Sequence, residues 1–311
     1  MRSIGAWLRL LRIPNHATAA ADVLAGFLIA SRAREVGPLP AAFWWALGAG
    51  LAFYAAGMVL NDVFDVDLDR HERPERPLPA GTIAVGTAAA VGRGLLTVGS
   101  LCACLAAFGS GHPAVALVGA ALAAAVWIYD RHAKATPFGP AVMGTCRGLA
   151  WLLGMTAAGG PATPAEWLIP IGMGLYAGGI TLYARDEAGQ SRAGTLTIAA
   201  LVMVAGLGIA GASIWLIAAA GGGAAAWLRS GRLGAWLMLW GVLAASILLR
   251  AMLGIIDPAS GRVQQAVGNA IMSMITLAAV LVLAVCGEAW AIVVLLLLVP
   301  FLLGRQIVSA T

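Results

Sequence analysis

The sequence predicts an all-α integral membrane protein, built as a polytopic bundle of transmembrane helices. Of its 311 residues, 61% are hydrophobic and only 11% are charged, and the mean hydropathy is +0.89. So few polar groups cannot cover the surface of a water-soluble domain of this size. Stretches that alternate polar and apolar residues are few, so we expect membrane-spanning helices and not a barrel.

The expected helices follow in order from the hydrophobic runs, because a helix needs about 20 residues to cross the hydrocarbon core of a bilayer. Ten runs of suitable length occur, at 15–31, 41–61, 82–109, 113–129, 138–159, 165–184, 194–220, 233–255, 264–286 and 288–304. The last is short and is separated from its predecessor only by Gly287 and Glu288. The connections are too short for an extramembrane domain, so residues 1–311 are predicted to form a single membrane domain.

Basic residues gather in alternate connections between the runs, which predicts the orientation in the membrane. One side collects Arg2, Arg9, Arg12, Arg70, Arg73, Arg76, Arg131, Lys134, Arg185, Arg192, Arg250, Arg262 and Arg305, and the other only Arg32, Arg34, Arg229 and Arg232. The positive-inside rule therefore places both termini in the cytoplasm. The net charge of +5 indicates no nucleic acid partner, because basic loops that face anionic headgroups of the lipid bilayer produce the same balance.

Residues 61–81, "NDVFDVDLDRHERPERPLPAG", concentrate acidic and basic side chains in a chain otherwise poor in charge. If the second helix continues past Leu60, then Asn61, Asp62, Asp65 and Asp69 lie along one face, whereas Asp67 points away. Stacked carboxylates repel one another unless a cation neutralises them. A set of oxygen ligands suits Mg²⁺, which binds through one or two carboxylates and substrate phosphate oxygens.

Basic side chains follow the aspartates directly and recur in the next connection on the same side. Guanidinium groups bind phosphate oxygens in a forked geometry. Carboxylates for metal and arginines for phosphate therefore indicate a diphosphate site whose organic tail lies among the helices. The alternative is a polar loop whose charges pair with one another, but topology requires only Lys and Arg, so the acidic residues favour the site.

This stretch resembles the first motif of the UbiA superfamily of intramembrane prenyltransferases, N-D-x-x-D-x-x-x-D followed by arginines and R-P-L. The matching residues are Asn61, Asp62, Asp65, Asp69, Arg73 and Arg76-Pro77-Leu78. The resemblance implies a nine-helix core, to which the tenth run adds a helix, and Lys134 in "YDRHAKATPFGP" as a diphosphate ligand. The segment "PNHATAAADVLAG" and the R-x-E pattern at 185–187 are similar to the EboC-like branch of this superfamily.

The second motif of the superfamily, D-x-x-x-D after the sixth helix, is only partly present. Asp186 occupies the first position as an expected metal ligand, but Gln190 replaces the second carboxylate. Glu187 lies about 100° around a helix from Asp186 and is not a direct substitute. Arg185 and Arg192 could contact phosphate in place of a second metal ion.

Several polar residues inside the expected helices are candidates for substrate binding. Asn15 and Asp22 are seven apart and share a face of the first helix. Asp22 contacts substrate or pairs with Arg147, which reaches toward substrate or snorkels to the interface. Tyr183, with Tyr176 seven residues earlier, lines the substrate cavity or belongs to the core.

The resulting hypothesis is Mg²⁺-dependent transfer of an isoprenyl group from a prenyl diphosphate to an unknown acceptor. Asp62, Asp65 and Asp69 would hold Mg²⁺, while Arg73, Lys134 and Arg192 would bind phosphate. Asp186 or Glu187 would remove a proton from the acceptor. Two alternatives stay open: cyclisation of a prenyl diphosphate, and binding or transport of a lipid diphosphate without turnover.

Overall fold

The computed structural model describes residues 2–33, 35–185, 191–219 and 231–309. Within these ranges the chain forms helices, turns and short irregular connections, and no strand, which confirms the predicted fold class. Six of the described helices are long and apolar enough to cross a membrane. Their apolar side chains account for the large exposed hydrophobic surface, which includes Trp44, Leu117 and Met238.

Each of the first nine hydrophobic runs corresponds to one helix in the described part of the chain. The largest error at an end is four residues, at the start of the ninth run, where 264 was expected and the helix begins at Ser260. The bounds are α2 His16–Ser31, α3 Ala41–Phe64, α5 Val85–Ser110, α6 Ala114–Ile128, α7 Gly139–Ala157, α8 Pro164–Tyr183, α9 Ala193–Ala219, α11 Leu233–Ile256 and α12 Ser260–Cys286.

The tenth run differs from its prediction, because it forms two short helices, α13 (Glu288–Leu295) and α14 (Leu298–Ser309). Pro300 has no N–H to donate to the carbonyl of Leu296, which explains the interruption. Proline is tolerated in the first turn of the helix that follows, where the N–H would have no helical partner. Both short helices pack against α2, so the tenth run covers that helix in two pieces.

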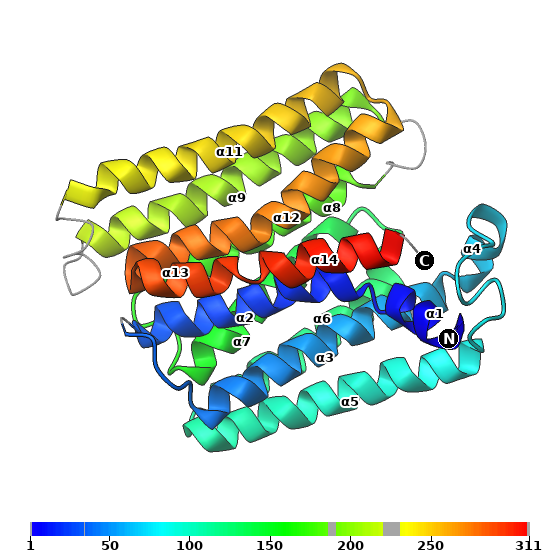
Figure 1. Ribbon diagram of the computed structural model, residues 1–311, viewed down its shortest axis with the longest axis horizontal. Coiled ribbons are helices and arrows are strands. Elements are labelled where there is room, and N and C mark those ends of the chain that lie inside the picture. Colours follow the sequence, from blue (N-terminus) through cyan, green and yellow to red (C-terminus); the bar gives the residue numbers. More distant parts are fainter. Residues whose placement is uncertain (1, 34, 186–190, 220–230, 310–311) are drawn as a thin grey trace.

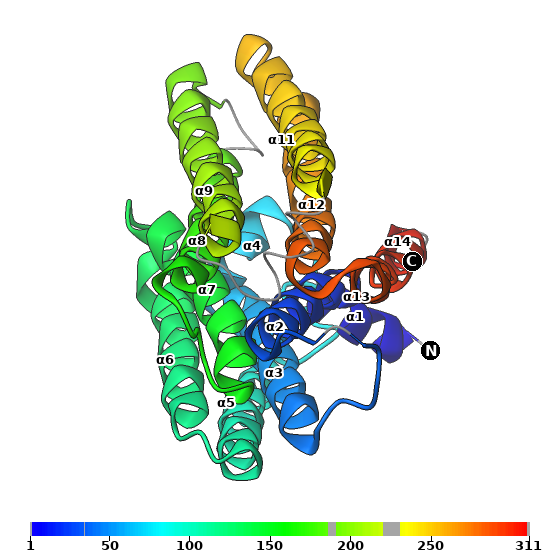
Figure 2. The same ribbon diagram turned by 90° about the vertical axis from the view of Figure 1, so that its left-hand side faces the viewer.

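Helix α2 lies in the middle of the bundle, in contact with α3, α7 and α12 (Figure 2). Helices α9 and α11 form one side of the molecule and α5 forms the other (Figure 1). Both marked chain ends lie toward the same end of the bundle's long axis as the short helix α4 (Val66–Glu72), which carries the last aspartates of the Asp-rich stretch (Figure 1). This arrangement brings the N-terminal segment to the same end of the bundle as the acidic residues.

The first helix along the chain, α1 (Arg2–Leu10), was not among the predicted segments, because it is too short to span a membrane. Its Ala6 and Leu10 are buried against Val59 of α3, together with Leu78 and Ile83 from the connection that follows α4. Helix α1 is therefore anchored by its apolar face beside the Asp-rich stretch, and it fixes the start of the segment that carries Arg12.

Four helices of the bundle touch one another through glycine at backbone distance. A Cβ added at Gly154 of α7 would overlap the carbonyl oxygen of Val23 in α2. A Cβ at Gly174 of α8 would lie 2.8 Å from the carbonyl oxygen of Gly144 in α7. Gly206 of α9 would meet the carbonyl oxygen of Gly172 in α8 at 2.5 Å. Helices α2, α7, α8 and α9 thus form a series in direct backbone contact, as small residues permit in membranes.

Replacing Gly154 with alanine is expected to destabilise the protein, because the added methyl group forces α2 and α7 apart. Overpacking of this kind costs about 1–3 kcal/mol. Thermal unfolding in detergent should show a lower midpoint for Gly154→Ala. The matched control is Gly208→Ala in α9, where nothing lies within 4 Å of the added Cβ. Equal midpoints for the two variants would contradict this account of the contact.

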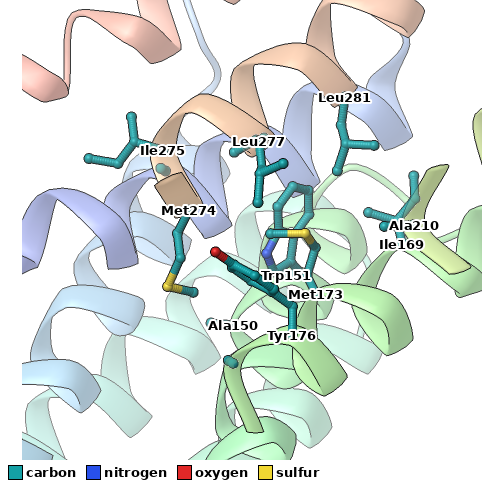
Figure 3. Packing of buried hydrophobic residues seen from close by; sticks show 14 of the residues in the cluster. Ala150, Trp151, Ile169, Met173, Tyr176, Ala210, Met274, Ile275, Leu277 and Leu281 are labelled. Atoms are coloured by element: carbon teal, nitrogen blue, oxygen red, sulfur yellow. The ribbon is translucent and has the colours of Figure 1, made fainter. Parts of the chain in front are cut away.

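The largest buried side chains fill the space between the glycine-packed helices and α12 (Figure 3). Trp151 of α7 and Tyr176 of α8 are both fully buried. The hydroxyl of Tyr176 donates to the carbonyl of Ala270 in α12 at 2.9 Å. Met173 and Met274 pack around these rings (Figure 3). The aromatic side chains therefore join α12 to α7 and α8.

Candidate functional site

Residues 61–72 of the Asp-rich stretch form a nearly continuous helix, interrupted only at Asp65 between α3 and α4. The amide of Asp65 bonds the carbonyl of Asn61 at 3.0 Å, and the amide of Asp69 bonds that of Asp65 at 2.8 Å. The side chains of Asp62 and Asp69 are 7% and 4% exposed, whereas that of Asp67 is 85% exposed and pairs with Arg70. The predicted register, with Asp67 pointing away from the other aspartates, is confirmed.

Each of the three inward aspartates lies beside a basic side chain from another part of the chain or from the motif itself. Arg12 Nη2 lies 3.1 Å from Asp62, and Lys134 Nζ lies 2.6 Å from Asp65. Arg76 Nη1 lies 2.7 Å from Asp69 and 3.7 Å from Asp62. Charges in the stretch do pair with one another, as the alternative interpretation held, but they do so where Asp62 and Asp69 are buried and Asp65 is half-buried, and not in an open loop.

Arg12 reaches Asp62 from a backbone conformation that side chains rarely adopt. Its φ of 48° and ψ of 49° are left-handed, between α1 and the short 3₁₀ turn Ile13–Asn15. A non-glycine residue in this region costs about 1 kcal/mol or more, and such strain concentrates at functional sites. From this position just before α2, the Arg12 guanidinium reaches Asp62 of α3.

A π-helical turn, Tyr129–Ala133, continues α6 and positions two charged side chains against α3. The amide of Lys134 bonds the carbonyl of Tyr129 at 3.0 Å, five residues back, in place of the usual four. Lys134 Nζ donates to the backbone carbonyl of Asn61 at 3.0 Å, in addition to its contact with Asp65. Asn61 Nδ2 lies 3.5 Å from the carboxylate of Asp130. Turns of this type occur frequently at functional sites.

A cavity of about 120 Å³ opens beside these residues, between α2, α3, α6 and α7. Its polar wall includes Arg12, Asn61 and Asp130 near the Asp-rich stretch and Arg147 from α7. The remaining wall is apolar or aromatic, with Phe53, Tyr54, Met58, Leu122, Val126 and Met143 among its members. The combination of a charged end and an apolar interior suits an amphiphile with an anionic headgroup.

Arg147 is held in the wall of this cavity by groups from α2, α3 and α12. Its Nη1 donates to Asp22 at 2.7 Å, and its Nη2 donates to the Thr18 hydroxyl at 2.6 Å. The guanidinium lies 5.4 Å from the centre of the Tyr54 ring, and the Asp22 side chain is fully buried. The predicted pairing of Asp22 with Arg147 is confirmed. Contact of either residue with substrate stays a prediction.

The donor set of Asp62, Asp65 and Asp69, next to the cavity, fits Mg²⁺ chemically. All candidate ligands are carboxylate oxygens, the type of ligand that Mg²⁺ prefers. Asp62 and Asp69 lie close enough together for one positive charge to contact both, because Arg76 Nη1 lies within 4 Å of each. In the described part of the chain, no three His, Cys, Asp or Glu side chains converge as a metal cluster. Asp62, Asp65 and Asp69 would hold the ion together with oxygens of the substrate, as Mg²⁺ sites on phosphate substrates commonly do.

Other predicted site residues lie outside this arrangement. Asp186 and Glu187 fall outside the described residues, and Arg185 and Arg192 on either side of them are exposed. Arg73 is half-buried and forms no ion pair among the described residues. Asn15 ends the 3₁₀ turn before α2, where its carbonyl accepts the Thr18 hydroxyl at 2.8 Å.

Tyr183 does not line the cavity, which corrects the expectation that it contacts substrate. Its hydroxyl donates to the carbonyl of Ala251 in α11 at 2.7 Å, and its ring is buried. Tyr176 makes the equivalent bond to α12. The two tyrosines, seven residues apart, therefore join α8 to α12 and α11 through their hydroxyl groups and do not form an aromatic wall for substrate.

The structure also brings Arg12 and Asp130 to the site, although neither was selected from the sequence for this role, and it places Arg76 of the first motif beside Asp69 and Asp62. Arg12 and Asp130 meet the aspartates only through tertiary packing. The weak signal for Asp130 was its position four residues before Lys134.

An all-α membrane bundle with a basic and acidic mouth over an apolar cavity defines the class of membrane enzymes and carriers that handle anionic lipids. The chain belongs to the UbiA prenyltransferase family, whose characteristic sequence pattern matches residues 21–269. The prediction of this family from the N-D-x-x-D-x-x-x-D motif is confirmed.

Similar curated proteins are digeranylgeranylglyceryl phosphate synthases. The protein of Methanopyrus kandleri is 32% identical over 172 residues, which are 52% of this chain and 56% of that protein. That of Sulfolobus acidocaldarius is 38% identical over 86 residues, 28% of this chain and 30% of that protein. The chain thus matches between about a third and about half of the length of these relatives.

Solved structures with the same fold cover most of the chain. A structure described for digeranylgeranylglyceryl phosphate synthase has a TM-score of 0.64 at 19% identity, and covers 93% of this chain and 100% of its own. A UbiA homolog from Archaeoglobus fulgidus bound to GPP and Mg²⁺ has a TM-score of 0.60 at 13% identity, with 93% and 99% coverage. At these identities the likeness establishes the fold.

Proposed function

We propose that the protein is a Mg²⁺-dependent prenyltransferase that moves an isoprenyl group from a prenyl diphosphate to a hydroxyl-bearing acceptor inside the membrane. The observation that carries the proposal is the set of three inward aspartates beside Arg12, Arg76 and Lys134, next to a largely apolar cavity that Arg12 and Asn61 help to line. A diphosphate headgroup matches the charged end, and an isoprenoid tail matches the apolar interior. The homolog bound to GPP and Mg²⁺ supports the same substrate class.

The chain's own residues perform binding, charge neutralisation and exclusion of water. Mg²⁺ held by Asp62, Asp65 and Asp69 would neutralise the diphosphate as it departs. Phosphate oxygens would accept charge-assisted hydrogen bonds from Arg12, Arg76 and Lys134. Arg73, in the first motif, and Arg192, close to the second motif, would contribute further bonds of this kind. The apolar wall, with Phe53, Leu122 and Met143, would keep water from the allylic cation.

The acceptor is proposed to carry a hydroxyl group and to enter from the bilayer. The name of the similar synthases describes a glyceryl phosphate that carries two geranylgeranyl groups, which supports a glyceryl phosphate lipid as acceptor class. Basic residues beside the aspartates and at the adjoining chain ends support a cytoplasmic site, with both termini in the cytoplasm. An anionic acceptor headgroup would be attracted to this basic face.

Purified protein in detergent is expected to release diphosphate from geranylgeranyl diphosphate only with Mg²⁺, and faster when geranylgeranylglyceryl phosphate is present. The measurement is diphosphate release coupled to mass spectrometry of the lipid products. A product containing both lipids supports transfer. Diphosphate release with only a cyclic hydrocarbon or alcohol product would overturn transfer in favour of cyclisation. Tight, Mg²⁺-dependent binding without release would favour a carrier.

A further inference from the structure

Asp130 is a buried acidic side chain in the wall of the cavity, and its exposed fraction is only 2%. It belongs to the π-helical turn and faces α3, where Gly57 has no side chain. A Cβ at Gly57 would stand 3.8 Å from Asp130 Oδ2. Asn61 contacts the other carboxylate oxygen, Oδ1, at 3.5 Å. Within the described residues, Asp130 Oδ2 has no hydrogen-bond partner.

The other acids around the cavity differ from Asp130 because they are already paired with cations. Asp62, Asp65, Asp69 and Asp22 each lie within 4.0 Å of an arginine or lysine nitrogen. In the described part of the chain, Asp130 forms no such ion pair, and it is the only acidic side chain among those that line the cavity. A carboxylate held by a guanidinium is a weak proton acceptor, because the cation stabilises its charged form.

We propose that Asp130 is the general base of the transfer reaction, an inference that rests on the proposed function. As the allylic C–O bond breaks, its electron pair leaves with the diphosphate. The acceptor hydroxyl oxygen forms the new C–O bond, and its proton passes to Asp130 Oδ2. The proton then leaves to solvent or to the released diphosphate, which returns the carboxylate for the next turnover.

The placement of Asp130 fits this role because it shares the cavity with a phosphate-binding side chain. Arg12 and Asp130 line the same cavity, and Lys134, four residues beyond Asp130, contacts Asp65 and the carbonyl of Asn61. Asp130 therefore borders the cavity that an acceptor would occupy, and its unpartnered oxygen lies next to Gly57 of the same wall. Asp186 and Glu187, the acids predicted from the sequence for this step, are not required by it.

The test compares Asp130→Asn and Asp130→Glu with the control Asp67→Asn, which changes an exposed aspartate of the neighbouring motif. Geranylgeranyl diphosphate and geranylgeranylglyceryl phosphate serve as substrates, and a non-hydrolysable geranylgeranyl diphosphate analogue measures headgroup binding with Mg²⁺. A general base contributes about 10²–10⁴-fold. Asp130→Asn should lower the transfer rate by about 100-fold or more relative to the unmodified protein. The dissociation constant of this variant for the analogue should differ from that of the unmodified protein by less than about threefold.

The ratio of transfer to hydrolysis separates a base from a structural residue. A structural defect lowers transfer and hydrolysis of the diphosphate together, whereas loss of the base lowers transfer more, so the ratio should fall. Asp130→Glu, which keeps a carboxylate, should recover part of the transfer rate. Wild-type transfer in Asp130→Asn, or loss of Mg²⁺-dependent analogue binding, would overturn the assignment. If the unmodified protein binds the analogue with Mg²⁺ but releases no diphosphate, the proposed function fails first.

Discussion

Replacing Asp62 with asparagine is expected to lower the rate of diphosphate release from a prenyl diphosphate by at least about 10³-fold, because the three inward aspartates are proposed to hold Mg²⁺. Asp62 is the acid that Arg12 and Arg76 both approach, at 3.1 and 3.7 Å. Its loss therefore removes a metal ligand and the group that fixes two phosphate-binding side chains. The measurement is diphosphate release from geranylgeranyl diphosphate over a range of Mg²⁺ concentrations.

Asp67→Asn is the matched control, because Asp67 belongs to the same motif but is 85% exposed and pairs only with Arg70. Its rate should stay close to that of the unmodified protein. Both variants should elute as folded protein in detergent, since asparagine keeps the size of aspartate. A release rate for Asp62→Asn within tenfold of the unmodified rate would contradict a metal-binding role for the motif.

Replacing Arg147 with methionine should give the largest loss of stability of any change considered. The substitution leaves the fully buried Asp22 carboxylate without its cation, and breaking a buried pair in this way costs about 3–5 kcal/mol. The free energy of unfolding in mixed micelles, measured by denaturant titration, reports the loss. Arg262→Met is the control, since Arg262 and Asp257 are each 51% exposed and such pairs contribute about 0–1 kcal/mol.

A second substitution distinguishes the cost of an unpaired charge from the loss of packing. Asp22→Asn combined with Arg147→Met removes both charges, so the double variant should be more stable than Arg147→Met alone. If the double variant is as unstable as the single one, packing of the long Arg147 side chain against Tyr54 accounts for the loss. An effect of Arg147→Met no larger than that of Arg262→Met would contradict the importance of the pair.

The membrane helices and the acidic register were predictable because they depend on local periodicity. A hydrophobic run reports the length of a span directly, and the spacing of Asp62, Asp65 and Asp69 reports a shared face wherever the backbone is helical. The pairing of Asp22 with Arg147 was predictable for a different reason. Two opposite charges at similar depth in a bilayer have few other partners.

The remaining features depend on contacts between distant segments or on small changes of backbone. Arg12 and Asp62 are fifty residues apart, so no local pattern places them together. The π-helical turn that positions Asp130 has no signal in hydropathy. Tyr176 and Tyr183 showed the expected helical spacing, but spacing alone did not reveal that their hydroxyls face α12 and α11.

The glycine contacts among α2, α7, α8 and α9 bear on how bulky lipids enter and leave. Helices whose main chains touch have no compressible side chains between them, so this part of the bundle behaves as a stiff frame. Helix α5 meets α3 where Phe53 and Leu60 pack against Gly99 and Gly92 of α5. Because α7 belongs to the stiff frame, a bulky lipid that enters the cavity is expected to find Arg147 in a fixed position.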